Sequence, residues 1–497
     1  MRIDDWMTQS QVAFGTSGAR GLVSDMTDAV CYAYTLGFLA YLRSTGQWRG
    51  GEVGIAGDLR ASTPRIMSAC ARAISDVGGT VINGGFIPSP AIALFGLSRH
   101  IPTLMVTGSH IPEDRNGIKF NLPTGEVLKR DEAGIRTQWV TVSPDLFDAR
   151  GMFRAVQPLP PVEPTPYRQY VARFTDFFPE GCLRGLRLGL YEHSSVGRQL
   201  FGEVLSALGA HVTRLGRSET FVSVDTEAIR PEDVVLGRQW GQTGMFDALI
   251  SADGDADRPL VSDEAGIWLR GDIAGILCAR YLEARGVVTP VSSNTALELS
   301  GWFEPVVRTR IGSPYVIEGM QSLVAGGNGS VVGYEANGGF LQATPLTRDG
   351  RTLEPLPTRD ALIVALSILM LARTRACPVS HLLMALPQRF THSDRIQDFP
   401  TAESQRRLAQ LQTGDAEADA RAIQALFGGQ LGGVQRVDTT DGLRIVFEGA
   451  DIVHLRPSGN APELRAYTEA SSPNRAQALN ALCLTVLRGW RAEVLGS

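Results

Sequence analysis

Residues 52–79 read EVGIAGDLRASTPRIMSACARAISDVGG, and this stretch indicates the fold class. Its first residues form a short apolar run typical of a buried strand, and the Gly-Asp pair that follows predicts a turn. Ser62 and Pro64 are start signals for a helix, and apolar residues then recur at helical spacing until Gly78 ends the pattern. The stretch therefore predicts one unit of strand, turn and helix.

Similar units recur further along the chain. Leu186–Tyr191 is a short apolar run followed by a helix that we expect to end near Gly209, and Ala248–Ser251 is another apolar run that leads into an acidic turn. The longest apolar stretch, residues 361–372, predicts a buried helix that begins at Asp360. Strands that alternate with helices form largely parallel sheets covered on both faces, so we expect three α/β domains.

Two changes of pattern divide the chain. Residues 158–166 contain five prolines, which exclude a helix interior and favour an extended connector. After about residue 378, a polar stretch with helical character (residues 401–427) precedes two apolar runs, 443–447 and 452–455. We expect these runs to be short antiparallel strands, so a smaller α+β domain closes the chain.

Composition excludes several classes of function. The chain of 497 residues has a net charge of −5 and no block of like charges, so a small molecule is a more suitable partner than a nucleic acid. Its six cysteines form no C-x-x-C pair, which argues against a zinc site or disulfides and fits a reducing, cytoplasmic compartment. The longest apolar stretch is too short to span a bilayer, so no membrane association is expected. Of 47 Lys and Arg residues only Lys119 and Lys129 are lysines, and neither follows a glycine, which excludes a Walker-type phosphate loop.

The serine loop, Thr107-Gly-Ser-His-Ile-Pro112, follows the apolar run Thr103–Val106. Open α/β sheets carry their chemistry at the ends of strands, which makes Ser109 a candidate reactive residue. The alternative is a serine that only completes a turn. The chain contains no Gly-x-Ser-x-Gly motif, which argues against an α/β-hydrolase.

The acidic loop, Asp253-Gly-Asp-Ala-Asp-Arg258, is more specific. Three carboxylates at alternate positions can converge on one hard cation, and oxygen ligands favour magnesium or calcium. A calcium EF-hand would need glycine at the sixth position, where this chain has Arg258, and a helix before the loop, where it has an apolar strand. An acidic surface turn remains the other interpretation.

Three further glycine-rich turns carry polar groups. The Glu335 loop (residues 333–340) offers a carboxylate and the Asn337 amide, a pair suited to sugar hydroxyls, although taken alone the pattern favours a simple glycine-rich turn. The Arg456 loop (residues 456–462) places a guanidinium, a hydroxyl and backbone N–H groups together, which suits a phosphate dianion as well as a structural turn. A third turn, residues 15–21, carries Arg20. Together these loops point to a phosphorylated substrate that several domains contact.

In their order along the chain, these motifs resemble the α-D-phosphohexomutase family, which comprises bacterial phosphomannomutases and phosphoglucomutases. The resemblance also includes Asn116–Phe120 after the serine loop and Thr309–Gly312 before the Glu335 loop. It implies an α/β fold with three similar domains of mixed or parallel sheets and a smaller C-terminal α+β domain around a central cleft. The expected domains are residues 1–157, 158–265, 266–378 and 379–497.

The resemblance also implies a mechanism. Ser109 would carry a phosphoryl group, donate it to the 1- or 6-hydroxyl of a hexose phosphate, and take back the other phosphate after the hexose 1,6-bisphosphate has turned around. The net reaction interconverts hexose 1-phosphate and hexose 6-phosphate, above all mannose phosphate, with activity on glucose phosphate. Mg²⁺ held by Ser109, Asp253, Asp255 and Asp257 would stabilise the transfer.

Substrate binding is implied for residues of three loops. Arg258 would lie against the transferred phosphate, Glu335 and Asn337 would bind the hydroxyls at positions 3 and 4, and the Arg456 loop would hold the distal phosphate. The complete set is Arg258, Arg310, Glu335, Asn337, Arg456, Ser458, Gly459 and Asn460. Because position 2 is then loosely contacted, activity on both mannose and glucose phosphates is expected.

The chain departs from the commonest family pattern in the loop often written Gly-Glu-Met-Ser-Gly-His. Asn337 and Gly339 stand where that pattern has serine and histidine. Without the histidine, we expect Lys119 to carry the proton of the reacting hydroxyl, with Arg20 polarising it and His110 as an alternative. The smaller departures are Ile111 for asparagine, Asn460 for threonine and Arg310 for lysine.

Other functions fit parts of the same pattern. Within the family, the alternatives are a phosphoglucosamine mutase and a mutase that acts primarily on glucose phosphate. Outside it, the alternatives are a catalytically silent sugar-phosphate sensor and a magnesium-dependent phosphatase. For the mutase we expect a cytoplasmic phosphoprotein, a monomer or weak homodimer, that serves nucleotide-sugar synthesis.

Overall fold

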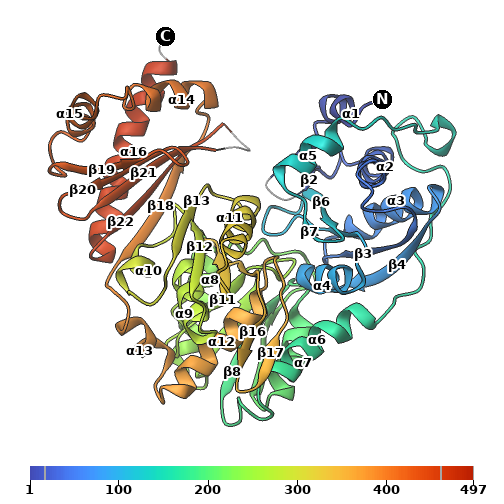
Figure 1. The fold of residues 1–497 in the computed structure, drawn as a ribbon, viewed down its shortest axis with the longest axis horizontal. Coiled ribbons are helices and arrows are strands. Elements are labelled where there is room, and N and C mark those ends of the chain that lie inside the picture. Colours follow the sequence, from blue (N-terminus) through green and yellow to red (C-terminus); the bar gives the residue numbers. More distant parts are fainter. Residues whose placement is uncertain (16–17, 459–461, 496–497) are drawn as a thin grey trace. The chain divides into compact units, whose positions relative to one another are not determined.

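The computed structural model describes residues 1–15, 18–458 and 462–495, and Figure 1 follows the chain through its elements. The chain forms two compact units. The first unit comprises Met1–Val287 and Gly312–Leu383, and the second comprises Val288–Ile311 and Met384–Ser497.

The first sheet has seven strands in the order β1-β2-β6-β5-β3-β4, with β7 paired to β6. Its strands are β1 (Ala13–Phe14), β2 (Ala19–Leu22), β3 (Gly51–Gly57), β4 (Gly79–Phe86), β5 (Thr103–Val106), β6 (Arg115–Leu122) and β7 (Gly125–Glu126). Strand β3 runs parallel to β4 and β5, whereas β6 is antiparallel to β5 and β2. The associated helices are α1 (Ile3–Ser10), α2 (Asp28–Ser44), α3 (Thr63–Asp76), α4 (Ser89–Arg99) and α5 (Lys129–Arg136), followed by the 3-10 turn Pro144–Leu146.

Helices cover both faces of this sheet, and α2 and α3 lie on the opposite side from α4 (Figure 1). A Cβ on Gly54 would meet Ile92 of α4, whereas one on Gly57 would meet Met67 of α3, which places the two helices on opposite faces. The predicted strand and helix of residues 52–79 are confirmed as β3 and α3. Ser62 precedes the helix, but its hydroxyl accepts a hydrogen bond from the Asn116 amide instead of capping α3.

The second sheet of the first unit has the order β11-β10-β8-β9. Its elements are α6 (Thr165–Phe177), β8 (Arg187–His193), α7 (Arg198–Ala207), β9 (His211–Arg217), α8 (Pro231–Gln242), β10 (Ala248–Ala252) and β11 (Pro259–Val261). Strand β8 is parallel to β9 and β10, and β11 returns antiparallel to β10.

The rest of the first unit contains a third strand pair and a buried helix. Its elements are α9 (Gly271–Tyr281), α11 (Ser313–Ala325), β14 (Val331–Tyr334), β15 (Phe340–Gln342), β16 (Leu346–Arg348), β17 (Arg351–Leu353), α12 (Ala361–Thr374) and α13 (Val379–Met384, whose last residue belongs to the second unit). Strand β12 (Gly286–Pro290) begins in the first unit and ends in the second. The predicted buried helix is confirmed as α12, because the Asp360 carboxylate caps it by accepting from the amides of Leu362 and Ile363.

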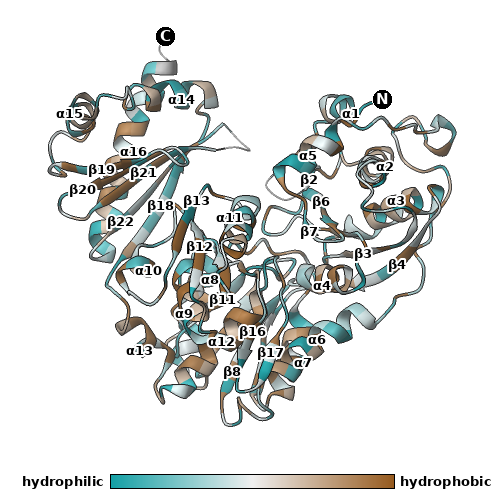
Figure 2. Ribbon diagram, viewed as in Figure 1, coloured by the Kyte–Doolittle hydropathy of each residue, from teal (hydrophilic) through white to brown (hydrophobic). Residues whose placement is uncertain are grey.

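The second unit is built on a five-stranded antiparallel sheet in the order β18-β22-β21-β20-β19. Its elements are α10 (Ala296–Leu299), β13 (Val306–Thr309), β18 (Phe390–Ile396), α14 (Thr401–Ala409), α15 (Ala416–Leu426), β19 (Val434–Asp438), β20 (Leu443–Phe447), β21 (Ile452–Pro457), β22 (Leu464–Ala470) and α16 (Pro473–Leu495). Figure 2 shows the hydrophobic colouring of β20 and β21 beside the hydrophilic α14. The predicted antiparallel strands and helix-rich stretch are confirmed.

The predicted α/β fold class is confirmed, with one refinement. The alternation of strands and helices suggested largely parallel sheets, but both larger sheets of the first unit are mixed. The reason is local: β6 and β11 are each joined to the preceding strand by a short loop, and a short loop can connect only antiparallel neighbours. Among the described residues, no helix combines the length and apolar character needed to cross a membrane. The division into four domains stays a prediction.

Candidate active site

Three of the predicted loops occupy equivalent positions, each between two neighbouring strands of a sheet. The serine loop joins β5 to β6, the acidic loop joins β10 to β11, and the Glu335 loop joins β14 to β15. In each case the two strands are antiparallel neighbours. Each loop therefore lies at the end of a strand, which is where reactive residues were predicted from the sequence. All three loops belong to the first unit.

A buried arginine holds the backbone of the serine loop. Arg60, only 1% exposed, lies just after β3 and was not predicted from the sequence. Its guanidinium donates at 2.6–2.9 Å to four carbonyl oxygens, those of Ser109, Ile111, Pro112 and Arg115. Its Nε also pairs with Asp58 Oδ2 at 3.2 Å. One side chain thus fixes the course of the loop around the candidate nucleophile.

Ser109 is fully buried and has a left-handed backbone conformation, with φ of 56°. Non-glycine residues seldom adopt this conformation, which is often found at functional sites. Thr107 Oγ1 accepts a hydrogen bond from the Ser109 amide at 2.7 Å and donates to Asp58 at 2.7 Å. The Ser109 hydroxyl donates to Asp253 Oδ2 at 2.5 Å, and its Oγ lies 3.3 Å from His110 Nδ1. The predicted serine and the first predicted metal ligand are therefore in contact.

The acidic loop forms a buried cluster of carboxylates. One oxygen atom from each of Asp253, Asp255 and Asp257 lies within 4.8 Å of the others. The Oδ1 atoms of Asp255 and Asp257 are buried and accept no hydrogen bond. Burial, with the two neighbouring carboxylates, raises the pKa of Asp253 well above its ordinary value. These oxygens that accept no hydrogen bond, and the mutual repulsion of the carboxylates, fit a site for a divalent cation such as Mg²⁺.

The acidic loop can approach the serine loop because residue 254 is glycine. A Cβ at Gly254 would lie 2.6 Å from the carbonyl oxygen of Ser109 and 3.0 Å from the ring of Phe221. Any side chain at this position would therefore push the two loops apart.

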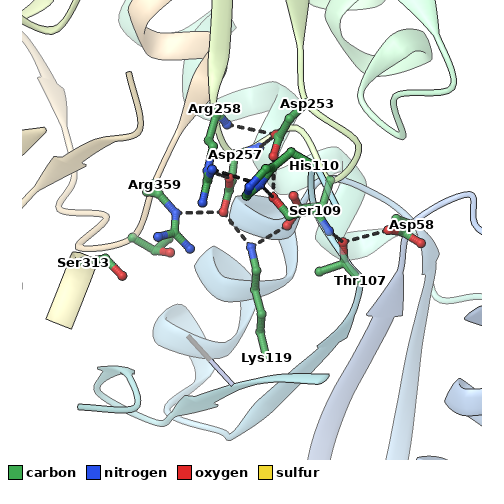
Figure 3. A network of polar contacts seen from close by, with 12 residues as sticks. Asp58, Thr107, Ser109, His110, Lys119, Asp253, Asp257, Arg258, Ser313 and Arg359 are labelled. Atoms are coloured by element: carbon green, nitrogen blue, oxygen red, sulfur yellow. Dashed lines mark hydrogen bonds and ion pairs between the residues drawn. The ribbon is translucent and has the colours of Figure 1, made fainter. Parts of the chain in front are cut away.

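Two predicted cations surround the cluster. Lys119 on β6 directs its Nζ to Asp257 Oδ2 at 2.6 Å (Figure 3). The same Nζ donates to Asp255 Oδ2 at 2.5 Å. Arg258 Nη1 lies 3.0 Å from His110 Nδ1. Burial and the nearby Arg258 lower the pKa of His110 well below its ordinary value, so its imidazole is neutral at pH 7.

Arg20 lies on β2, the neighbour of β6. Burial, together with the repulsion of Arg258 and Arg359, lowers the pKa of Arg20 to about 10. At neutral pH Arg20 therefore remains charged, beside two other guanidinium groups and the carboxylates of Asp255 and Asp257.

Arg359 connects the acidic loop to the Glu335 loop and was not predicted from the sequence. It immediately precedes Asp360, the cap of α12, and its side chain is 2% exposed. Its Nε donates to Asp257 Oδ2 at 2.9 Å, and its Nη1 donates to Glu335 Oε2 at 3.1 Å. Although burial acts in the opposite direction, Arg359 and Lys119 hold the pKa of Asp257 below its ordinary value.

The stem of Arg359 also explains the glycine at position 339. A Cβ on Gly339 would lie 2.4 Å from Arg359 Cδ. The space that a side chain at position 339 would need is therefore filled by Arg359. Asn337 Oδ1 accepts from the Gly339 amide at 2.9 Å, which stabilises the turn between Glu335 and Gly339.

The predicted anion-binding residues of the second unit gather at one turn. Arg310 Nε donates to the carbonyl oxygen of Thr440 at 3.1 Å, and Arg456 Nε pairs with Asp441 Oδ2 at 2.8 Å. Ser458 is buried, and its amide donates to the carbonyl of Glu463. Gly459 and Asn460, also predicted, lie outside the described residues.

The structure therefore divides the predicted site residues into two groups. The first unit brings together the following residues around the acidic cluster: Arg20, Ser109, His110, Lys119, Asp253, Asp255, Asp257, Arg258, Glu335 and Asn337. The second unit brings Arg310 and Arg456 to one turn. A scan of the sequence could not find Arg60 or Arg359, because arginine is the ordinary basic residue of this chain and carries no positional signal.

Comparison with protein families and known proteins finds matches along most of the chain. The phosphoglucomutase/phosphomannomutase alpha/beta/alpha domain I matches residues 11–142, alpha/beta/alpha domain III matches residues 270–390, and the C-terminal domain matches residues 403–483. A phosphomannomutase of Salmonella muenchen is 42% identical over 95% of both chains. A phosphomannomutase of Sinorhizobium fredii is 41% identical over 95% of this chain and 98% of its own.

More distant relatives differ in name. A phosphoglucosamine mutase of Sorangium cellulosum is 30% identical over 76% of this chain and 77% of its own. Among solved structures, a phosphoglucomutase/phosphomannomutase family protein of Burkholderia thailandensis has a similar fold, with a TM-score of 0.72 over 96% of this chain and 97% of its own at 20% identity.

Proposed function

Because the chain belongs to the phosphoglucomutase/phosphomannomutase family, we propose that it interconverts mannose 1-phosphate and mannose 6-phosphate and also acts on glucose phosphates. The observation that carries the proposal is the contact, at 2.5 Å, between the buried Ser109 hydroxyl and Asp253, one of the three carboxylates of the acidic cluster. A serine among carboxylates and arginines is suited to receive and release a phosphoryl group.

In the proposed cycle, Ser109 begins as a phosphoserine. Mannose 1-phosphate binds with its 6-hydroxyl toward the phosphoserine, the bond between phosphorus and Ser109 Oγ breaks, and the 6-hydroxyl oxygen bonds to phosphorus. The resulting mannose 1,6-bisphosphate turns around and returns the 1-phosphoryl group to Ser109 Oγ. Mannose 6-phosphate leaves, and the phosphoserine is restored.

In each transfer the attacking hydroxyl loses a proton and the oxygen that leaves phosphorus gains one, so a group must accept the proton and then return it. We assign this shuttle to Lys119, whose Nζ lies beside two of the three aspartates, and we place Arg20 beside the reacting hydroxyl. His110 is the alternative acceptor, because it is neutral at pH 7 and lies 3.3 Å from Ser109 Oγ.

Asp253, Asp255 and Asp257 would hold Mg²⁺ with an oxygen carried by Ser109. When bound, the ion neutralises charge on the phosphoryl oxygens during transfer. Arg258 is proposed to lie against the same phosphoryl group, because its guanidinium is directed to His110 in the serine loop.

The remaining predicted residues are assigned to substrate binding. Glu335 and Asn337 are proposed to bind sugar hydroxyls, and the second phosphate is assigned to Arg310, Arg456, Ser458, Gly459 and Asn460. Since none of these contacts reads the configuration at position 2, glucose and mannose phosphates are both accepted. We further propose a cytoplasmic role in the supply of nucleotide sugars, with the protein a monomer or weak homodimer.

A direct assay tests the proposal. Incubation of the protein with mannose 1-phosphate, Mg²⁺ and a trace of hexose 1,6-bisphosphate should yield mannose 6-phosphate. Intact mass should show one phosphate on the protein, and Ser109→Ala should remove both the mass and the turnover. Failure to convert any hexose phosphate would reject the proposal, and release of inorganic phosphate faster than isomer formation would identify a phosphatase instead.

A second candidate function is that of a phosphoglucosamine mutase. The similarity to the Sorangium cellulosum protein favours testing it, whereas Ala336 and Asn337 stand where such enzymes usually have glutamine and serine. Comparison of kcat/KM for mannose, glucose and glucosamine phosphates decides between the two, with the highest value expected for mannose phosphate.

A further inference from the structure

A segment outside the predicted motifs touches two of the candidate catalytic loops. The crossover segment, residues 218–226, begins directly after β9 in the connection to α8 and contains no helix or strand. Its Ser223 hydroxyl donates to the carbonyl oxygen of His110 in the serine loop. Its Thr226 hydroxyl donates to the carbonyl oxygen of Asn337 in the Glu335 loop at 2.6 Å. Two hydroxyls of one short segment therefore hold two different loops.

The crossover segment also contacts the support of the serine loop. The ring of Phe221 lies 3.8 Å from the guanidinium carbon of Arg60, the residue that binds four carbonyls of that loop. The same ring would be 3.0 Å from a Cβ on Gly254. Phe221 thus packs where the serine and acidic loops meet.

The segment itself is firmly anchored. Val224, between the two hydroxyl residues, is fully buried in the core around Tyr191 and Trp268. The Val222 amide donates to Ser194 Oγ at 2.7 Å. An anchor between Ser223 and Thr226 means that the two loops are held by one rigid piece of backbone.

The Glu335 loop is also closely packed on its other sides. A Cβ on Gly271, at the start of α9, would lie 2.3 Å from the Gly338 amide nitrogen, and one on Gly338 would lie 2.9 Å from Pro259. Thr226 and Asn337 are 1% and 6% exposed, so if the Thr226 hydroxyl were removed, water could hardly take its place as the donor to the Asn337 carbonyl. The Thr226 bond therefore helps to fix where the side chains of the loop lie.

We propose that the crossover segment positions the Glu335 loop relative to the serine loop, with Thr226 and Ser223 as the two positioning residues. Neither residue is assigned a contact with substrate. The kinetic consequences rest on the proposed mutase function, whereas the structural consequences do not.

The kinetic test compares variants that remove or keep each hydroxyl. Thr226→Val removes the hydroxyl that holds the Glu335 loop, so KM for mannose 1-phosphate should rise about tenfold, equivalent to about 1.4 kcal/mol, with kcat little changed. Thr226→Ser keeps a hydroxyl and should restore KM. Ser223→Ala should instead lower kcat with KM little changed. Thr220→Val, which alters an exposed hydroxyl bonded only within the segment, is the matched control.

Hydrogen exchange monitored by mass spectrometry tests the same idea without any substrate. Thr226→Val should speed amide exchange in residues 335–339 but not in residues 109–115. Ser223→Ala should speed exchange in residues 109–115 but not in residues 335–339. The proposal would be overturned by equal changes in both loops or by no change beyond that of Thr220→Val. It would also be overturned if exchange in Thr226→Ser were as fast as in Thr226→Val. If the wild-type protein converts no hexose phosphate, the proposed function fails, while the exchange experiment still decides the role of the segment.

Discussion

Replacement of Arg60 by methionine tests whether one side chain organises the serine loop. The substitution removes the guanidinium but keeps an apolar stem of similar length. In the native protein the Arg60 and Asp58 side chains are both fully buried, and the guanidinium makes four bonds to loop carbonyls as well as the ion pair. Arg60→Met therefore leaves one buried carboxylate and several buried carbonyls without their donor.

The expected cost follows from these contacts. Breaking a buried ion pair by removing one partner costs about 3–5 kcal/mol. Each buried carbonyl left without a donor would add about 1–3 kcal/mol if nothing moved. Because the loop can shift to reach water, and because Thr63 and Thr107 still donate to Asp58, we expect a total loss of about 3–5 kcal/mol.

Urea unfolding followed by circular dichroism measures this loss. Arg72→Met is the matched control, because Arg72 lies on the surface of α3 and pairs with Asp76, a type of contact worth at most about 1 kcal/mol. Hydrogen exchange should also increase in residues 109–115, and phosphate on Ser109 should be lost. An Arg60→Met protein as stable as the control, with unchanged exchange in that loop, would refute the reasoning.

Four further predictions address other parts of the molecule. Lys119→Arg should keep substrate binding, measured by calorimetry, but lose most turnover, since arginine cannot release a proton at neutral pH; near-normal turnover would remove Lys119 from the proton transfer. Gly339→Ala should displace Arg359, lower the free energy of unfolding by about 1–3 kcal/mol and raise KM, whereas Gly329→Ala, with open space around it, should do neither. Burial lowers the pKa of His454 to about 4, so as the pH falls this histidine takes up a proton in the unfolded chain before it does so in the folded protein. The free energy of unfolding should therefore decrease between about pH 6.5 and pH 4. His454→Gln should reduce that decrease by about 3 kcal/mol, measured by urea unfolding at a series of pH values. Chelation with EDTA should abolish turnover, Mg²⁺ should restore it, and persistence of turnover in EDTA would contradict the assignment of the acidic loop.

Local patterns accounted for much of the fold. The unit β3–α3, the Asp360 cap of α12 and the strand pair β20–β21 each depend on residues close together in the sequence, where periodicity and capping signals are informative. The direction of β6 and β11 could not be predicted in this way, because short apolar runs look the same in parallel and antiparallel strands. Only the pairing partners decide it.

The candidate site divides in the same way. Ser109 and the acidic triad stand in distinctive motifs, so the sequence identified them, and the structure places them in contact. The contributions of Arg60 and Arg359 come from partners far along the chain: Arg60 binds carbonyls about 50 residues away, and Arg359 pairs with Asp257, 102 residues away. No local pattern records such partners, so these residues emerge only from the folded structure.

The turn at Thr440 and Asp441 has a consequence for ligand affinity. It binds Arg310 from 130 residues away, and it also pairs with Arg456. Immobilising a long side chain at an interface costs about 0.5–1.5 kcal/mol in lost rotamer freedom. Here the two guanidinium groups are already held by the fold, so an anion that binds them meets preorganised donors and does not have to restrict two flexible side chains. Affinity for the phosphate proposed to bind at this turn would thus be set in part during folding, by a backbone carbonyl and a carboxylate that need not touch the ligand.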